Sequence, residues 1–190
     1  MSVSVQTRRR TMDTLRIIRH DSLYHSVRAM DNGATLSTNA FADVARDFCT
    51  WCEQPIESVT RNTVAASWLC KLYASALSLC QAEPENENGL PEIPTAILAQ
   101  AARGLSGLNG WYYREYFNPD PTVTDESVLG DVGDDLFDIY TDIRRGLLLY
   151  DRGEIKDALW HWEFNFRIHW GRHAVGAIFA LHCMSISKTD

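Results

Sequence analysis

Several large protein classes are excluded by what the sequence lacks. No apolar run approaches the roughly 18 residues that a membrane-spanning helix requires. Five cysteines are too few for a disulfide scaffold of this length, and no secretory apolar segment opens the chain, so we expect a protein of the reducing cytoplasm. Lysine and arginine number 18, against 25 aspartate and glutamate residues. Nucleic-acid binding is therefore not expected, because contacts with phosphates need a basic surface.

The motifs of familiar catalytic sites are missing as well. The sequence contains no G-x-S-x-G, no G-x4-G-K, no G-x-G-x-x-G and no ferritin-type Glu-x-x-His pair. Cys49 and Cys52 have the spacing of a redox motif, but no strand precedes them, and we interpret them as core cysteines. The run Asp134-Asp135-x-x-Asp138 matches a magnesium-diphosphate pattern that is too short to be specific. Enzymatic activity is left open, with a non-enzymatic protein favoured.

Enough apolar side chains are present for one compact core. Of the 190 residues, 45% are hydrophobic and 23% are charged, as in a globular domain. No segment alternates polar and apolar residues between turn signals, whereas apolar residues recur at helical spacing through most of the chain. We predict an all-α, single-domain bundle of about five helices over residues 39–190, with a long and largely buried C-terminal helix.

The first 38 residues differ in charge from the rest of the chain. They contain six arginines and three aspartates, whereas the remainder is acidic. We interpret residues 1–38 as a flexible basic tail. The alternative is an over-long start assignment, with Met30 as the true initiator.

Apolar periodicity and turn residues place the expected helices. The first begins with Thr38 or Asn39 as N-cap and ends before Pro55, and the second spans about 59–81. The third runs from about 94 to 105, and the fourth ends at Gly153, a residue suited to the C′ position. Residues 111–117 form an aromatic segment. The last helix, about 154–184, has apolar residues on nearly every side, so we expect the other helices to enclose it.

Three polar residues interrupt the apolar face of this last helix. At about 100° per residue, Asn165, His169 and His173 share a face with Trp162. Their i, i+4, i+8 spacing lets each contact the next, and the two imidazoles could share a metal ion. A polar network that fixes helix register is the alternative interpretation. In either arrangement the buried polar groups need hydrogen-bond partners. The candidates are Glu115, Tyr113, Tyr140 and the carboxylates of the fourth helix. Among these carboxylates, Asp138 is the preferred third metal ligand.

Those carboxylates form an acidic stripe. Four of them share one face at 4-3-4 spacing: Asp131, Asp135, Asp138 and Asp142. This face lies roughly 120° from the middle of the helix's apolar face, so we expect it to meet solvent or the edge of a groove. Nine acidic residues and no lysine or arginine occur from Glu115 to Asp142. Such a field would attract a cation or a basic partner surface.

The C-terminal sequence carries a recognisable signature. It reads Trp160-x-Trp162-x-Phe164-Asn165-Phe166-x-x-His169-Trp170-Gly171-x-His173-Ala174. This stretch, with the aspartate-rich fourth helix, resembles a bacterial domain-of-unknown-function family of small helical proteins over about residues 41–182. The resemblance implies an all-helical cytoplasmic bacterial protein. Because that family has no assigned activity, it assigns no catalytic residue here.

Two hypotheses about function follow. The first is a non-enzymatic module that binds a protein with a basic surface through an acidic and aromatic groove, without a cofactor; six tryptophans, a residue favoured at interfaces, support it. The second is a protein that binds a divalent metal or small ligand through His169, His173 and a carboxylate from Asp138, Asp135 or Glu115, with hydrolysis as one use of the metal. Carboxylates of the fourth helix turned toward the last helix would favour the second. Periodicity turns them mostly away, so the first is preferred.

Overall fold

The structure is a computed structural model that describes residues 31–55, 60–86, 89–118, 120–124 and 126–186. The chain divides into two compact units, Met1–Asp31 and Asn32–Asp190. Residues 1–30 of the expected basic tail lie outside the described residues. All elements below, apart from the first residue of α2, belong to the second unit.

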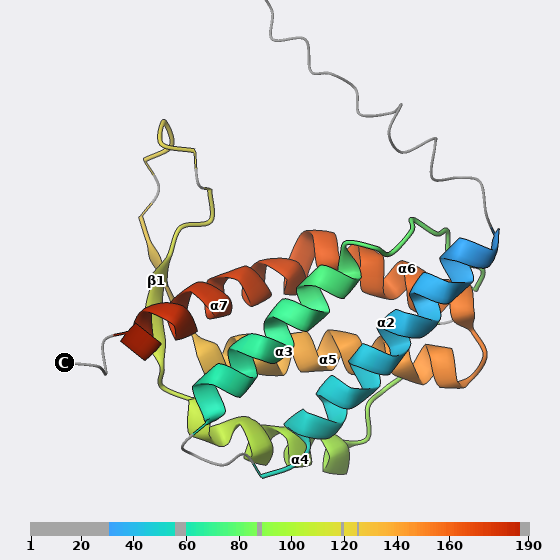
Figure 1. Cartoon of the computed structure of the whole chain (residues 1–190), viewed down its shortest axis with the longest axis horizontal. Helices are drawn as coiled ribbons and strands as arrows, with labels where there is room; N and C mark the ends of the chain where they lie inside the picture. The colour runs from blue at the N-terminus through green and yellow to red at the C-terminus, as the bar shows by residue number, and fades with distance from the viewer. Residues whose placement is uncertain (1–30, 56–59, 87–88, 119, 125, 187–190) are drawn as a thin grey trace, which may run out of the picture. The chain divides into compact units, whose positions relative to one another are not determined.

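Helices dominate this unit, which confirms the predicted all-α class. In chain order the elements are α2 (Asp31–Cys52), α3 (Arg61–Ala76), α4 (Thr95–Leu105), η1 (Ser106–Leu108), β1 (Tyr112–Glu115), β2 (Val128–Asp131), α5 (Val132–Asp151), α6 (Ile155–Asn165), η2 (Phe166–Trp170) and α7 (Gly171–Ile186). Figure 1 shows α2 and α3 crossing over the elements formed by the C-terminal half of the chain.

The helix ends agree with the sequence in some places and differ in others. Gly153 has φ 82° directly after α5, as expected of a residue that ends a helix. The N-cap of α5 is Asp131, whose Oδ1 accepts from the Gly133 N–H at 2.9 Å. The first helix, in contrast, begins at Asp31, so Thr38 and Asn39 lie within α2 and do not cap it.

A two-stranded antiparallel sheet was not predicted. Strand β1 falls within the expected aromatic segment and pairs with β2, with Tyr113 opposite Gly130. The pairing is close because Gly130 has no side chain: a Cβ there would lie 2.6 Å from the Tyr113 ring. Each strand has only four residues, too few for alternation to be recognised.

The core is centred on α5 and α6, which form an antiparallel pair. Trp162 is fully buried against Gly146, where an added Cβ would lie 2.0 Å from the indole Nε1. The indole N–H donates to the Ile143 carbonyl at 3.1 Å, and the ring packs 4.9 Å from that of Phe41 on α2. A buried tryptophan is thus both packed and hydrogen-bonded.

The long C-terminal helical run contains a π-turn, η2. Before this turn the buried residues include Ala158 and Trp162, and from its last residue onward they include Trp170, Ala174, Ala177 and Leu181. An unbroken α-helix would bring positions 169 and 173 under Trp162 instead. One additional residue in the wider turn therefore shifts the apolar face by one position. His169 and His173 are turned to the side of the buried face, which corrects the expectation that they share a face with Trp162.

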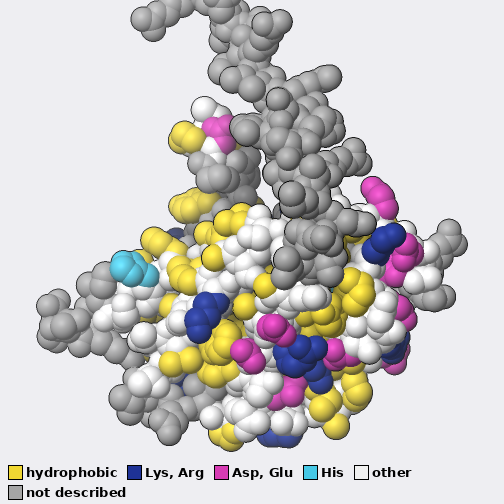
Figure 2. Space-filling model, turned by 45° about the vertical axis from the view of Figure 1, so that its right-hand side comes forward, with side chains coloured by type: hydrophobic (Ala, Val, Ile, Leu, Met, Phe, Trp, Pro, Cys, Tyr) yellow, Lys and Arg dark blue, Asp and Glu magenta, His cyan; other side chains and the backbone are white. Residues whose placement is uncertain are grey.

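The surface has both charges and exposed apolar groups. On the face drawn in Figure 2, acidic and basic side chains alternate with hydrophobic ones. The last helix is less enclosed than expected, because Ile168, Val175 and Phe179 are all more than half exposed. In the described part of the chain, no helix has the length and apolarity needed to cross a membrane.

Candidate functional site

The acidic stripe of α5 was expected to meet solvent or the edge of a groove, and its members differ in exposure. Asp135 and Asp142 are 5% and 6% exposed and are covered by η2 and α7. Asp138, between them, keeps about two-fifths of its side chain exposed. The burial of these two aspartates was not predicted, because the angle was measured against the α5 apolar face alone, whereas the C-terminal helical run also packs along the acidic edge. Two carboxylates are consequently buried and need partners.

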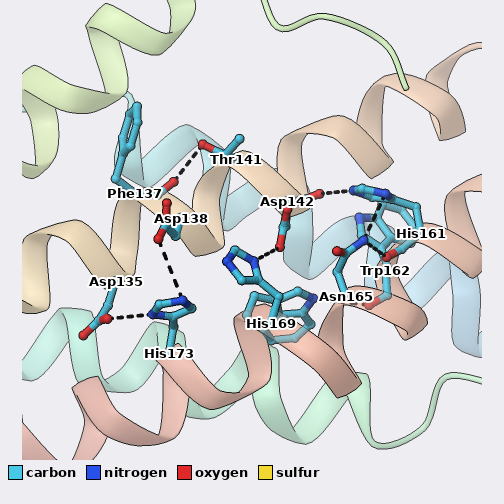
Figure 3. A network of polar contacts seen from close by, with 11 residues as sticks. Asp135, Phe137, Asp138, Thr141, Asp142, His161, Trp162, Asn165, His169 and His173 are labelled. Carbon is cyan, nitrogen blue, oxygen red and sulfur yellow. Dashed lines mark hydrogen bonds and ion pairs between the residues drawn. The ribbon is translucent and has the colours of Figure 1, made fainter. Parts of the chain in front are cut away.

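Each buried aspartate is paired with one histidine. The His169 Nδ1 lies 2.7 Å from Asp142 Oδ2, and the His173 Nδ1 lies 2.8 Å from Asp135 Oδ1. A proton on Nδ1 shared with the carboxylate leaves Nε2 of the neutral ring with a free lone pair. The bond to Asp135 also raises the pKa of His173 above its ordinary value, against the opposing effect of burial. Figure 3 shows the two pairs side by side.

Tyr113 completes the surroundings of Asp135. Its hydroxyl donates to Asp135 Oδ2 at 2.9 Å, so both carboxylate oxygens of this aspartate are hydrogen-bonded. Burial, together with the Asp135 charge, raises the pKa of Tyr113 well above its ordinary range, which keeps the phenol protonated. Strand β1 thereby ties α5 to α7. A Cβ at Gly176 would lie 2.4 Å from the Tyr113 hydroxyl, so this glycine makes room for it.

At the other end of the network lies His161, which the sequence analysis missed. Its Nε2 is 3.0 Å from the Asp142 backbone carbonyl, and burial lowers its pKa. Asn165, a predicted member of the network, donates from Nδ2 to the His161 carbonyl at 2.8 Å (Figure 3). Asn165 thus contacts His161, one turn earlier, and not His169. The sequence signal for His161 was its position four residues before Asn165, which extends the same i, i+4 series by one turn.

His169 and His173 approach each other and Asp138. The two imidazole centroids are 4.8 Å apart, and the His173 Nε2 is 3.8 Å from Asp138 Oδ2. One potential ligand atom from each of the three residues lies within 4.8 Å of the others. Ligand atoms at about 2.0–2.2 Å from one zinc ion would be roughly 3–4 Å apart, so a small closure is required. All three side chains are partly exposed and have room to make it.

His169 and His173 line a cleft of about 830 Å³, which we call the histidine cleft, and Asp138 is not among its lining residues. Asp134 and Phe137 also line it. Glu115 lies at its edge and accepts from Arg172 Nε–H at 2.9 Å. Glu115 was predicted as a candidate partner of the polar residues on the last helix. It pairs with Arg172, which the sequence analysis did not single out.

Other predicted members lie outside the network. The Tyr140 hydroxyl donates to Glu53 at 2.8 Å, and burial raises its pKa. Asp131 caps α5 and also accepts from the Gly110 N–H at 2.7 Å. Neither residue is hydrogen-bonded to the two histidines in the described structure, although Asp131 lines the same cleft.

The arrangement combines two imidazoles that line a cleft with one nearby carboxylate. Imidazole and carboxylate ligands suit zinc and ferrous iron, and three protein ligands leave coordination positions for water or substrate. The paired aspartates would orient the rings in the way that outer carboxylates orient metal-binding histidines. The geometry thus fits a divalent transition-metal ion.

Comparison with known proteins identifies the family. The family described as Domain of unknown function (DUF5063) matches residues 33–187. The crystal structure of protein BF1032 from Bacteroides fragilis is similar, with 25% sequence identity, a TM-score of 0.60, and coverage of 78% of this chain and 94% of that one. A search of curated proteins gives no match. The match covers most of the chain, including every element of the site, and the protein belongs to the DUF5063 family.

Proposed function

We propose that the protein binds a divalent transition-metal ion through the Nε2 atoms of His169 and His173 and a carboxylate oxygen of Asp138. One observation carries the proposal: two buried aspartates hold both imidazoles by Nδ1, and the remaining ligand atoms form one group with Asp138. Burying two carboxylates costs free energy. A role in orienting the two imidazole rings toward a cleft would account for their burial. Within the described chain, neither Nε2 atom has a protein hydrogen bond, so both are available.

The ligand set favours zinc or ferrous iron over magnesium and calcium, which prefer all-oxygen sites. A water molecule in a remaining coordination position would be acidified by the metal and would face the histidine cleft. Metal-assisted hydrolysis is the reaction class that this arrangement supports best. Tyr113 and Asp135 would then position His173.

Isothermal titration of untagged, chelator-treated protein tests the proposal. We expect one equivalent of Zn²⁺ to bind, Mg²⁺ not to bind, and Zn²⁺ to raise the melting temperature. The double variant His169→Ala/His173→Ala should weaken Zn²⁺ binding by about a hundredfold or more, because only Asp138 remains. His182→Ala, an exposed histidine later on α7, is the matched control. Sub-stoichiometric binding, or equal affinity in the double variant, would refute the metal site.

Protein binding is the second candidate function. It is supported by Tyr112 and Leu129, which are 60% and 69% exposed and line the histidine cleft together with the exposed Asp134. An acidic surface beside apolar side chains suits a basic partner. A partner captured from lysate by the native chain should be lost with Leu129→Asp and retained with Leu77→Asp, a similarly exposed leucine at the end of α3. Equal capture by both variants would count against this function.

A further inference from the structure

A second hollow adjoins the histidine cleft. It measures about 590 Å³, and we call it the α7 groove. Phe166, Val175, Gly176, Phe179 and Tyr116 contribute to its lining. Val175 and Phe179 are 51% and 62% exposed, one turn apart on the same side of α7. Exposed apolar side chains gathered along a hollow indicate a place where an apolar group binds.

The α7 groove is basic, unlike the chain as a whole. Arg114, Arg167 and Arg172 line it, and Glu115 is its one acidic lining residue among those described. Two of the arginines have acidic neighbours: Arg167 pairs with Glu163 at 2.7 Å and Arg172 with Glu115 at 2.9 Å. Three guanidinium groups beside apolar side chains complement a ligand that is both apolar and negatively charged.

Arg172 is held where the two hollows meet. It lines both, as do Glu115 and Phe117. Its guanidinium carbon lies 3.6 Å from the centre of the Phe117 ring, and its Nε–H donates to Glu115. For the four N–H groups on the Nη atoms, the described residues supply no hydrogen bond. A guanidinium fixed in this way presents a planar edge to an oxyanion, next to His169 and His173.

We propose that the α7 groove binds an anionic amphiphile. Its carboxylate or phosphate head lies against the Nη atoms of Arg172, where the two hollows meet, and its apolar tail lies along Val175 and Phe179 in the α7 groove. The part that concerns the metal rests on the proposed function: a bound ion would supply a second contact to the head. The contact with Arg172 and the burial of the tail do not depend on the metal.

Calorimetric titration of the full chain with octanoate tests this proposal. Acetate removes the tail, octyl phosphate changes the head, and octyltrimethylammonium reverses the charge. We expect octanoate or octyl phosphate to bind about tenfold or more tightly than acetate, because only they bury a tail, and the cation not to bind. Each titration is run with chelator and again with one equivalent of Zn²⁺. Failure of Zn²⁺ to bind refutes the proposed function alone, whereas the chelator titrations still test the groove.

Substitutions of two exposed residues, Arg172 and Phe179, test the head contact and the tail contact separately. Arg172→Gln should weaken octanoate binding about tenfold, and Arg172→Lys should restore part of the loss. Phe179→Asp should abolish the advantage of octanoate over acetate while leaving Zn²⁺ binding unchanged. Equal binding of octanoate and acetate to the native chain would overturn the proposal. So would a concentration-dependent dimer that Phe179→Asp dissociates and octanoate does not, because the α7 groove would then be an interface between copies.

Discussion

The two ends of the C-terminal helical run pack against the rest of the protein in different ways. Around α6, Trp162 packs against Gly146 in a region of ordinary helix contacts. Around η2 and α7, the buried face is shifted by one residue, and two histidines lie beside buried aspartates. The first region follows from helical periodicity. The second arises from one local departure from it, which suggests that the π-turn is what builds the site.

Single-residue deletions test the importance of that departure, and their effects should be the largest. Deleting the exposed Ile168 within η2 should convert the turn to α-helix and keep Trp170 and Ala174 in contact with the core, at little cost in stability. Deleting the exposed Val175 within α7 should rotate Leu181 out of the core and cost roughly 3–5 kcal/mol. Urea unfolding measures both. Equal destabilisation by the two deletions would show that η2 cannot lose one residue at a smaller cost in stability than the regular helix α7.

The Trp162–Gly146 contact should be the next most sensitive feature. Gly146→Ala adds a Cβ 2.0 Å from the buried indole Nε1, which must move away from the Ile143 carbonyl. We expect a loss of about 2 kcal/mol, because overpacking exceeds the gain in helix propensity. Gly89→Ala is the control, since nothing lies within 4 Å of its added Cβ. A Gly146→Ala variant as stable as the native chain in urea would contradict the packing.

Much of the fold was readable from the sequence for a physical reason. Apolar periodicity predicted the fourth helix, α5, and Gly153 predicted its end, because both depend on local geometry. The sheet was missed because its pairing joins Tyr113 to Gly130 across a connection that no local pattern encodes.

The site was only partly predictable. The i, i+4 spacing correctly brought His169 and His173 together, whereas Asp138 was only a candidate ligand because periodicity turned the α5 carboxylates mostly away. The exact partners depend on the rotation introduced by η2, which no residue type indicates. Asp142 was expected in solvent or at a groove edge, and Tyr140 was a candidate partner of the histidines although it donates to Glu53. That His169, His173 and Asp138 bind a metal ion remains a prediction.

The aspartate–histidine pairs should affect metal binding more than folding. Asp142→Asn keeps a group that can hydrogen-bond His169 but removes the charge that favours the Nδ1–H form. We expect Zn²⁺ affinity to fall by about 10–100-fold. Asp134→Asn, on the same helix and exposed, should change affinity by less than about twofold and serves as the control. Equal affinity in all three proteins would show that the pairs do not orient metal ligands.

The smallest expected effect concerns His161 and the pH dependence of stability. Burial lowers its pKa in the folded chain, with Asp142 opposing and Arg145 reinforcing the shift, so the unfolded chain takes up the proton first as pH falls. The contribution of His161 to stability should therefore decrease from about pH 7 downward, through the unfolded-state pKa of about 6.5.

Urea unfolding with chelator present, at several pH values between about 5 and 8, measures this dependence. In His161→Gln the amide can still donate to the Asp142 carbonyl, so the variant should lose less stability than the native chain on acidification. The raised pKa of His173 acts with the opposite sign, since its contribution is complete at low pH and is lost as pH rises above about 6.5. His173 is present in both proteins and cancels in the comparison, and His182→Gln should follow the native curve. Identical curves for His161→Gln and the native chain would mean that His161 is as readily protonated in the folded state as in the unfolded one.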